Sequence, residues 1–411
     1  MADWEKVRFD QLASPERWAF SIGPFGSKVT TSDYREAGVP FIRGVNLAQG
    51  IFFDDGFVYI ADEKAEEIES ALVKPGDIIF TRKGTVGQVS MIPRNSRYEK
   101  YAISGSQVKA RIDERHAVPE FYYYWFRSSA GQHSILEHAV TTGVPSLANS
   151  LQSIRGLMVP KPSRAEQSAV AEVLGAVDDK IAVNERIATT YERLLQYRFT
   201  ELGLSDEPDG EEAIAVTDLV EFNPKLSRPQ ADEPVYVDMA ALQTDRAGIP
   251  VWTRRAPKSG PRFMNGDTLL ARITPCLENG KTGYVDFMED GEVGLGSTEF
   301  IVMRSLPGVP AELSYFLARD GRFREHAIRA MVGTSGRQRV SAADAANFIV
   351  NRPDTDELAS FGRHAKAAFT HLKSLQDENR TFTTLRDTLL PQLMSGRLRV
   401  KDAEKIVEDH V

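Results

Sequence analysis

The sequence repeats one pattern at a separation of about 190 residues. "KPGDIIFTRKGTVGQV" (74–89) is answered by "MNGDTLLARITPCLENGKTGYV" (264–285), and "VPEFYYYWFRS" (118–128) is answered by "VPAELSYFLAR" (309–319). Self-similarity at so long a period indicates a tandem duplication of one domain. The length of 411 residues agrees, since it exceeds what one ordinary hydrophobic core serves.

Two further stretches extend the repeat. "AISGSQVKAR" (102–111) is answered by "GLGSTEFIVMR" (294–304), and "TTGVPSL" (141–147) by the looser "TSGRQRV" (334–340). Each copy begins with short strand-like runs separated by Gly, Pro, Asn and Asp turns, and then contains an amphipathic helix. We therefore expect an α+β fold made of two tandem α/β domains.

Each copy closes with a long helical pattern, over about 163–202 and 355–393. Apolar side chains there recur at spacings of four and three residues, which is typical of a coiled-coil seam. The first seam contains Val170, Leu174, Val177, Ile181, Ala188, Tyr191 and Leu195, and the second contains Leu358, Phe361, Ala365, Ala368, Leu372, Leu375, Phe382, Leu389 and Leu393. Ser163 with Glu166 predicts a capping box, and Gly203 and Gly396 predict the helix ends.

One asparagine interrupts each seam, Asn184 in the first and Asn379 in the second, 195 residues apart. A polar side chain at a core heptad position can fix helix register at a cost in stability. An asparagine that merely faces solvent is the alternative, but the matching positions favour the register role.

Charge is unevenly distributed along the chain. The net charge is −8, but 201–221 alone carries eight acidic and no basic side chains. Lys and Arg outnumber Asp and Glu by nine to four in 74–115 and by six to two in 319–340. Such local basic excess is what contact with phosphate requires. The acidic stretch 204–213 is interpreted as a linker.

Several function classes are disfavoured by the composition. No apolar run of about 18 residues is present, so we expect no membrane segment. The N-terminus carries no targeting pattern, and the single Cys276 argues against a disulfide framework or a cysteine zinc site. Histidines lack metal-ligand spacing, so no metal site is expected. These features predict a cytoplasmic protein.

With the duplication and the paired helices, a set of short motifs resembles the type I restriction-modification specificity subunits over nearly the whole chain. The motifs are "SIGPFGS" (21–27), "AGVPFIRGVNL" (37–47), "GDIIFTRKGTVG" (76–87), "VPKPSRAEQ" (159–167), "EFNPKL" (221–226) and "LLPQLMSGRL" (389–398). "PDTDEL" (353–358) departs from "PSRAEQ" at the second helix start.

The resemblance implies that each domain is a target recognition domain reading one half of a split double-stranded DNA site. The long helices would form an antiparallel coiled-coil spacer and dock two methyltransferase subunits, with two restriction/translocase subunits as further candidate partners. S-adenosylmethionine would belong to the methyltransferase, ATP and Mg²⁺ to the motor-nuclease, and no catalysis or cofactor to this chain. The implied domains are recognition domains at 1–160 and 204–352, helical spacers at 163–203 and 355–397, and a tail at 398–411.

Most candidate DNA-contacting residues are basic and small polar side chains in loops at corresponding places of the two halves. Arg43 and Asn46 are instead implied by the resemblance, and Arg254 and Arg255 are chosen because they lie near Trp252. The first half offers Arg43, Asn46, Arg82, Lys83, Thr85, Ser104, Ser106, Gln107, Thr141, Thr142 and Ser146. The second half offers Arg254, Arg255, Arg272, Thr274, Lys281, Ser297, Thr298, Ser335, Arg337 and Arg339. The aromatic run "FYYYWF" (121–126) is interpreted as core rather than as a base-stacking platform.

Two other functions remain open at this point. A stand-alone enzyme is disfavoured because "ENGKT" (278–282) has Pro275 where a phosphate-binding loop needs glycine, and "FNPKL" lacks the Pro-aromatic ending of a methyltransferase motif. A structural coiled-coil adaptor would explain the helices but not the duplicated basic loops.

Overall fold

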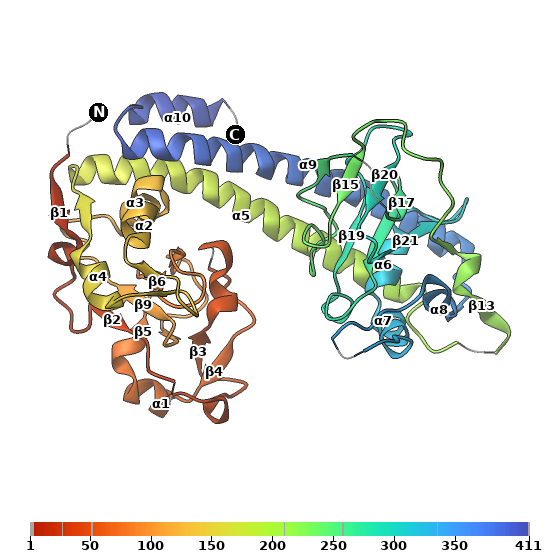
Figure 1. Cartoon of the computed structure of the whole chain (residues 1–411), viewed down its shortest axis with the longest axis horizontal. Coiled ribbons are helices and arrows are strands. Elements are labelled where there is room, and N and C mark those ends of the chain that lie inside the picture. The colour runs from red at the N-terminus through yellow and green to blue at the C-terminus, as the bar shows by residue number, and fades with distance from the viewer. Residues whose placement is uncertain are drawn as a thin grey trace. The chain divides into compact units, whose positions relative to one another are not determined.

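The structure is a computed structural model that describes residues 4–26, 28–50, 52–208, 210–256, 259–334 and 336–409 (Figure 1). Contacts divide the chain into two compact units. The first unit comprises 1–180 and 382–411, and the second comprises 181–381. Each unit therefore combines one sheet-containing region, called here the first or second head, with part of both long helices.

The first head is built on two four-stranded sheets. One sheet has the antiparallel order β2-β9-β6-β7, and the other has the order β4-β3-β8-β5 with β3 and β8 parallel. Small antiparallel pairs join β1 to β12 and β10 to β11. The strands are β1 (Lys6–Arg8), β2 (Phe20–Ile22), β3 (Val39–Ile42), β4 (Val58–Ile60), β5 (Leu72–Val73), β6 (Ile78–Thr81), β7 (Val89–Met91), β8 (Tyr101–Ile103), β9 (Gln107–Ala110), β10 (Ala139–Val140), β11 (Ser146–Leu147) and β12 (Met158–Pro160). The helices are α1 (Asp62–Glu67), α2 (Pro119–Arg127), α3 (Ser129–Leu136) and α4 (Ser150–Gly156).

The second head repeats this topology. Its sheets run β14-β21-β18-β19, all antiparallel, and β16-β15-β20-β17 with β15 and β20 parallel. The strands are β13 (Ala213–Ala215), which pairs with β22 (Ile349–Asn351), then β14 (Val220–Phe222), β15 (Val235–Val237), β16 (Thr253–Arg254), β17 (Arg262–Phe263), β18 (Asp267–Ala271), β19 (Thr282–Tyr284), β20 (Gly294–Gly296) and β21 (Phe300–Ser305). The helices are α6 (Leu313–Arg319), α7 (Gly321–Arg329) and α8 (Ala342–Ala346). The predicted duplication and mixed α/β domains are confirmed.

The repeated G-D step has a structural role in both heads. Its glycine has φ of +90° in each copy, a backbone conformation that favours glycine. The aspartate that follows is buried and forms a two-bond ion pair with an arginine, at 2.7–2.8 Å. Asp77 pairs with Arg111, which directly follows β9, and Asp267 pairs with Arg304 of β21. Each step thus joins a turn to the centre of a sheet.

The long helices are α5 (Arg164–Glu201) and α9 (Thr355–Met394). The predicted capping box starts α5, since Ser163 Oγ accepts from the Glu166 amide and the Glu166 carboxylate accepts from the Ser163 amide. Gly203 and Gly396 follow the two helices with φ of +70° and +64°. Every predicted seam residue is buried or half-buried, which confirms both seams.

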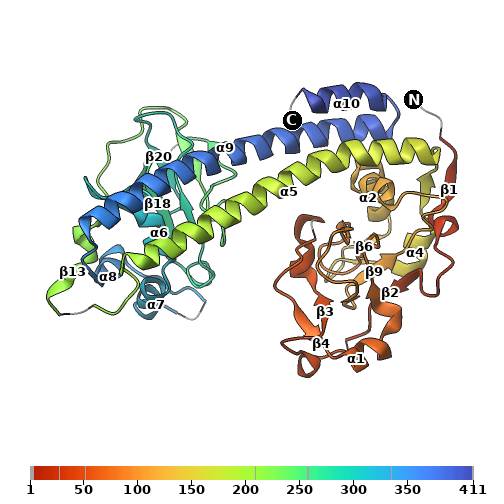
Figure 2. The same ribbon diagram turned by 180° about the vertical axis from the view of Figure 1, so that it is seen from behind.

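Helices α5 and α9 run antiparallel (Figure 2). In the second unit Tyr191 contacts His371 while Phe199, further along α5, contacts Phe361, earlier in α9. Asn184 is buried, and its Nδ2 donates to Asn379 Oδ1 at 2.8 Å. The two asparagines therefore meet across the seam instead of facing solvent, as the register hypothesis requires.

The segment 398–411 contains a helix where the sequence predicts only a tail. Helix α10 (Val400–Glu408) lies along the C-terminal end of α9 in both views (Figures 1 and 2) and buries Ala403 and Val407. The spacing of these two side chains is the helical signal that the sequence interpretation missed.

Each head is fixed to the helices of its own unit by a tyrosine at the same place in the repeat. In the first unit Tyr124 of α2 donates to Asp178 of α5 at 2.9 Å. In the second unit Tyr315 of α6 donates to the buried Glu192 of α5 at 3.0 Å. The aromatic run 121–126 forms α2 and is mostly buried, so its interpretation as core is confirmed. No helix in the described parts of the chain is both long and apolar enough to cross a membrane.

Candidate nucleic-acid interface

Three polar loops meet beyond the end of β6 in the first head. The Arg82 amide donates to Ser106 O at 2.8 Å, and the Arg82 carbonyl accepts from the Leu147 amide at 2.9 Å. A third bond joins Gly84 N to Pro145 O at 2.9 Å. Loops 82–87, 104–106 and 141–147, which the sequence analysis selected separately, therefore form one surface.

The second head repeats this loop frame bond for bond. The Arg272 amide donates to Glu299 O at 3.0 Å, and the Arg272 carbonyl accepts from the Val340 amide at 3.0 Å. Thr274 N donates to Gln338 O at 3.0 Å, which corresponds to the bond between Gly84 N and Pro145 O in the first head. Arg82 and Arg272 hold the same central position, so the two frames are equivalent and differ only in their side chains.

Two predicted DNA contacts are wrong because their amide groups serve the fold. Asn46 is 2% exposed, and it accepts from the Arg43 amide and donates to Asp55 O. Gln107 is fully buried, and its Oε1 accepts from both the amide and the hydroxyl of Ser104. Neither side chain reaches the surface of its loop.

Several predicted cations are committed to partners within their own head. The Arg82 guanidinium donates to Ser150 Oγ at 2.7 Å and to Gly105 O at 2.8 Å. In the second head Arg254 pairs with Glu292 at 2.7 Å, and Lys281 donates to Met239 O at 2.9 Å. Arg255 lies over the Tyr236 ring at 3.3 Å, and Arg339 is paired with Glu299. These contacts position loops and leave less hydrogen-bonding capacity for a ligand.

The remaining candidates divide by exposure. Exposed side chains are Lys83, Thr85, Thr141, Thr142, Thr298 and Arg337. Half-buried side chains are Arg43, Ser104, Ser106, Ser146, Arg272, Thr274 and Ser297. Ser335 lies outside the described residues. Among the described residues, no hydrogen bond or ion pair engages the charged groups of Arg43, Lys83, Arg272 and Arg337. Each head therefore presents unpaired cations at its loops.

Two charged residues beside the second frame are missing from the sequence-based set. Glu299 accepts three bonds from Arg339, and that pairing, aided by the charge of Arg272, holds the pKa of its carboxyl below the ordinary value. Arg324 of α7 donates to Glu278 O, and burial together with the charge of Arg319 lowers its pKa. The sequence repeat could have pointed to Glu299, because this acidic residue occupies the position that Ser106 holds in the first copy.

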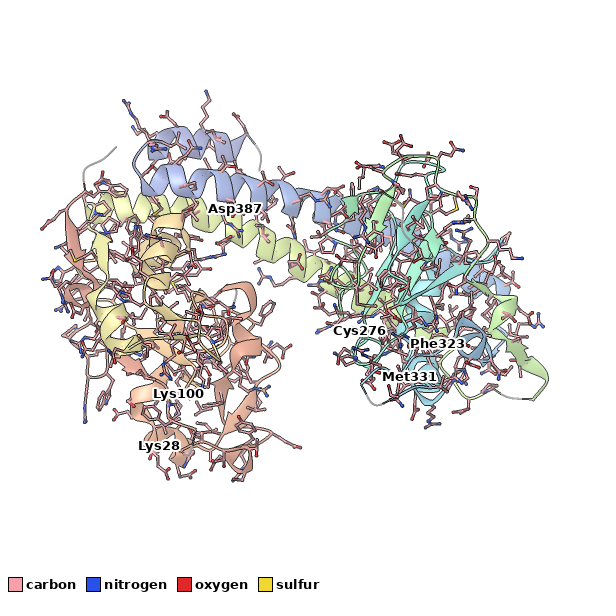
Figure 3. All side chains as sticks on the ribbon, in the orientation of Figure 1. Lys28, Lys100, Cys276, Phe323, Met331 and Asp387 are labelled. Carbon is pink, nitrogen blue, oxygen red and sulfur yellow. The ribbon has the colours of Figure 1, made fainter. Side chains whose placement is uncertain are left out.

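The described loop residues show no metal-binding arrangement. Among the described ranges, no three His, Cys, Asp or Glu side chains are grouped so as to hold an ion. Cys276, labelled in Figure 3, lies half-buried in the loop after Thr274 and is a free thiol. The described loops carry backbone, hydroxyl and cationic groups, together with the Glu299 carboxylate that is paired with Arg339.

Comparison with known protein families decides the assignment of the first head. Residues 3–193 match the family model of the type I restriction modification DNA specificity domain. This region is a type I specificity domain. It takes in the first head and most of α5, and the match confirms the resemblance that the sequence motifs indicated.

Individual relatives carry the same description. The chain is 26% identical over 211 residues to the type I restriction enzyme EcoEI specificity subunit of Escherichia coli, a match spanning 49% of this chain and 35% of that relative. It is 21% identical over 400 residues to the type I restriction enzyme MjaIX specificity subunit of Methanocaldococcus jannaschii, a match that covers 90% of this chain and 89% of that relative. The matched part thus spans about a third of the length of the Escherichia coli relative.

A solved structure shares the fold of the whole chain. The type I restriction-modification S subunit from M. genitalium aligns with a TM-score of 0.53 and 14% identity, over 95% of this chain and 96% of that one. The shared fold includes both heads, and the second head has the same topology as the first.

Proposed function

We propose that this chain is the DNA specificity subunit of a type I restriction-modification complex and reads a bipartite site, one half with each head. The observation that carries the proposal is the duplicated loop frame around Arg82 and Arg272, which presents unpaired cations in both heads. Cations contact phosphates, and forked or polar side chains read base edges. In this function the α5–α9 pair sets the gap between half-sites.

Two methyltransferase subunits are the proposed partners of the helices, and two restriction/translocase subunits are proposed as further members of the complex. Supporting this role, α5 carries exposed apolar side chains within the second unit, including Val183, Leu194 and Tyr197. Val183 and Leu194 border a hollow of about 480 Å³ together with Arg186, Ile187, Thr190 and Tyr191. Exposed apolar patches of this kind mark protein interfaces.

The chain itself is proposed to be non-catalytic and to bind no cofactor. S-adenosylmethionine would act in the methyltransferase partner, and ATP with Mg²⁺ in the motor-nuclease partner. The candidate surfaces carry hydroxyl, ammonium and guanidinium groups, which suit recognition of DNA base edges and phosphates. The proposed place of action is the cytoplasm, where the DNA and these partners meet.

The decisive experiment is methylome sequencing of a methylation-free host that expresses this chain with its methyltransferase partner, compared with hosts expressing either protein alone. We expect a split motif with a fixed gap only in the co-expressing host. A purified complex should also bind its motif with an affinity that falls steeply with salt. A stable complex without methylation and without salt-dependent DNA binding would instead support the adaptor function.

A further inference from the structure

The guanidinium of Arg272 is an unsatisfied group at the centre of the second loop frame. Its backbone is fixed on both sides, by Glu299 O and by the Val340 amide, at 3.0 Å each. The side chain is half-buried, and its Nε is shielded from solvent without a hydrogen-bond partner among the described residues. No hydrogen bond or ion pair to the described residues engages the rest of the guanidinium either, so its donors remain available to an acceptor on a ligand.

A second arginine stands beside it in a fixed orientation. Arg339 donates from Nε to both Glu299 oxygens at 2.8 and 3.0 Å, and from Nη2 at 2.7 Å. Its backbone pairs with Ile273 on one side and with Val332 on the other. Because the backbone pairings and the carboxylate fix Arg339, the part of the loop that carries it is arranged before any ligand binds.

The first head holds different side chains on the equivalent frame. Ser106 corresponds to Glu299 and Ser146 to Arg339, by position in the repeat and by the matching backbone bonds. Arg82 is the counterpart of Arg272, and its guanidinium donates to Ser150 Oγ and to Gly105 O within the head. Among the residues that the structure describes, the arginine-rich arrangement is therefore found in the second head and not in the first.

We propose that Arg272 reads a guanine in the half-site bound by the second head, and that the Glu299–Arg339 pair positions the loop for this contact. The inference rests on the proposed DNA-specificity function. Guanine presents the O6 and N7 acceptors that the arginine fork fits, whereas adenine presents one acceptor and one donor. The Glu299 carboxylate repels a phosphate at this place, and its oxygens are already engaged by Arg339, so it is not free to read cytosine.

The test uses the full methyltransferase complex and methylome sequencing. Arg272→Ala is expected to relax the motif at one G·C position in one half-site only, with about tenfold weaker discrimination against the other bases. Arg272→Gln should shift the tolerated base at that position toward adenine, because an amide pairs with N6 and N7 of adenine. Arg352→Ala, an exposed arginine of the same unit outside the loops, is the matched control and should leave the motif unchanged.

A substrate modification gives a readout that does not depend on how a variant folds. A duplex carrying 7-deazaguanine at the affected position lacks the N7 acceptor, and the wild-type complex should bind it about tenfold more weakly. Glu299→Gln should weaken discrimination at the same position while leaving the other half-site intact.

The remaining outcomes each overturn the inference in a distinct way. Guanine readout by Arg272 is refuted if the half-site bound by the second head contains no G·C pair, or if the motif of Arg272→Ala is unchanged. If Arg272→Ala instead weakens DNA binding equally at all sequences, and the slope of log affinity against log salt concentration falls by about one, Arg272 contacts a phosphate rather than a base. Absence of any motif in the wild-type complex overturns the proposed function itself.

Discussion

Replacing Lys109 by methionine should stabilise the first unit near neutral pH. Lys109 lies on β9 and is 1% exposed, and its ammonium group donates to Leu72 O at 2.5 Å. Burial, together with the nearby charge of Arg111, lowers its pKa from 10.5 to about 8. The equivalent position of the second head, on β21, holds the apolar Val302, so the fold does not require a cation there.

The magnitude follows from the pKa difference between the folded and unfolded chain. The folded state disfavours the protonated amine, so the penalty is fully present below pH 8 and fades as the pH rises toward 10.5. At about 1.4 kcal/mol per pKa unit, the penalty is about 3 kcal/mol at pH 7. Loss of the bond to Leu72 O offsets about 1 kcal/mol, which leaves a gain of about 2 kcal/mol for Lys109→Met.

Urea unfolding followed by tryptophan fluorescence provides the assay, because three of the four tryptophans lie in the first unit. As the pH rises from 7 to 9, the difference in unfolding free energy between the variant and the wild type should shrink by about 1 kcal/mol, because the wild type loses part of its penalty. Val302→Met is the control and should leave this pH slope unchanged. A variant that is less stable than the wild type at pH 7, or that keeps the same slope, would refute the reasoning.

Two further substitutions probe buried polar pairs. Asn184→Ala removes the donor to Asn379 Oδ1 at the seam and should lower the unfolding free energy of the second unit by about 1–3 kcal/mol, although Asn379 Nδ2 keeps its bond to Glu185. Leucine at both asparagine positions should be near neutral or stabilising, and thermal melts of the single and double variants check this. Arg111→Met leaves the buried Asp77 without its cation and should cost the first unit about 3–5 kcal/mol in urea unfolding, and a loss below 1 kcal/mol would contradict the role assigned to this pair.

The features that the sequence predicts well are those with a repeated or periodic signal. The duplication appears because both copies keep the same turn glycines and buried aspartates, and the helices appear because a seam needs regular apolar spacing. The capping box at Ser163 follows from local chemistry and is confirmed. The two asparagines could be matched because their positions in the repeats agree.

The individual side chains of the loops are harder to assign from sequence. Asn46 and Gln107 have the polarity of DNA contacts, but backbone amides nearby need acceptors, and the loops use these side chains to supply them. Arg82 and Arg272 look alike in sequence, yet only Arg82 has Ser150 within reach. The role of Glu299 depends on a partner 40 residues away, which composition does not reveal. Such pairings are set by tertiary packing.

The loop frame has a consequence for how such a protein can change over evolutionary time. The bonds that hold the loops of each head together run between backbone amides and carbonyls, at Arg82 in one copy and Arg272 in the other. Backbone bonds tolerate almost any side chain, so Ser106 in one head and Glu299 in the other occupy the same place without altering the fold. Substitutions at these positions therefore need not destabilise the fold, and the side chains that the loops present can change one residue at a time.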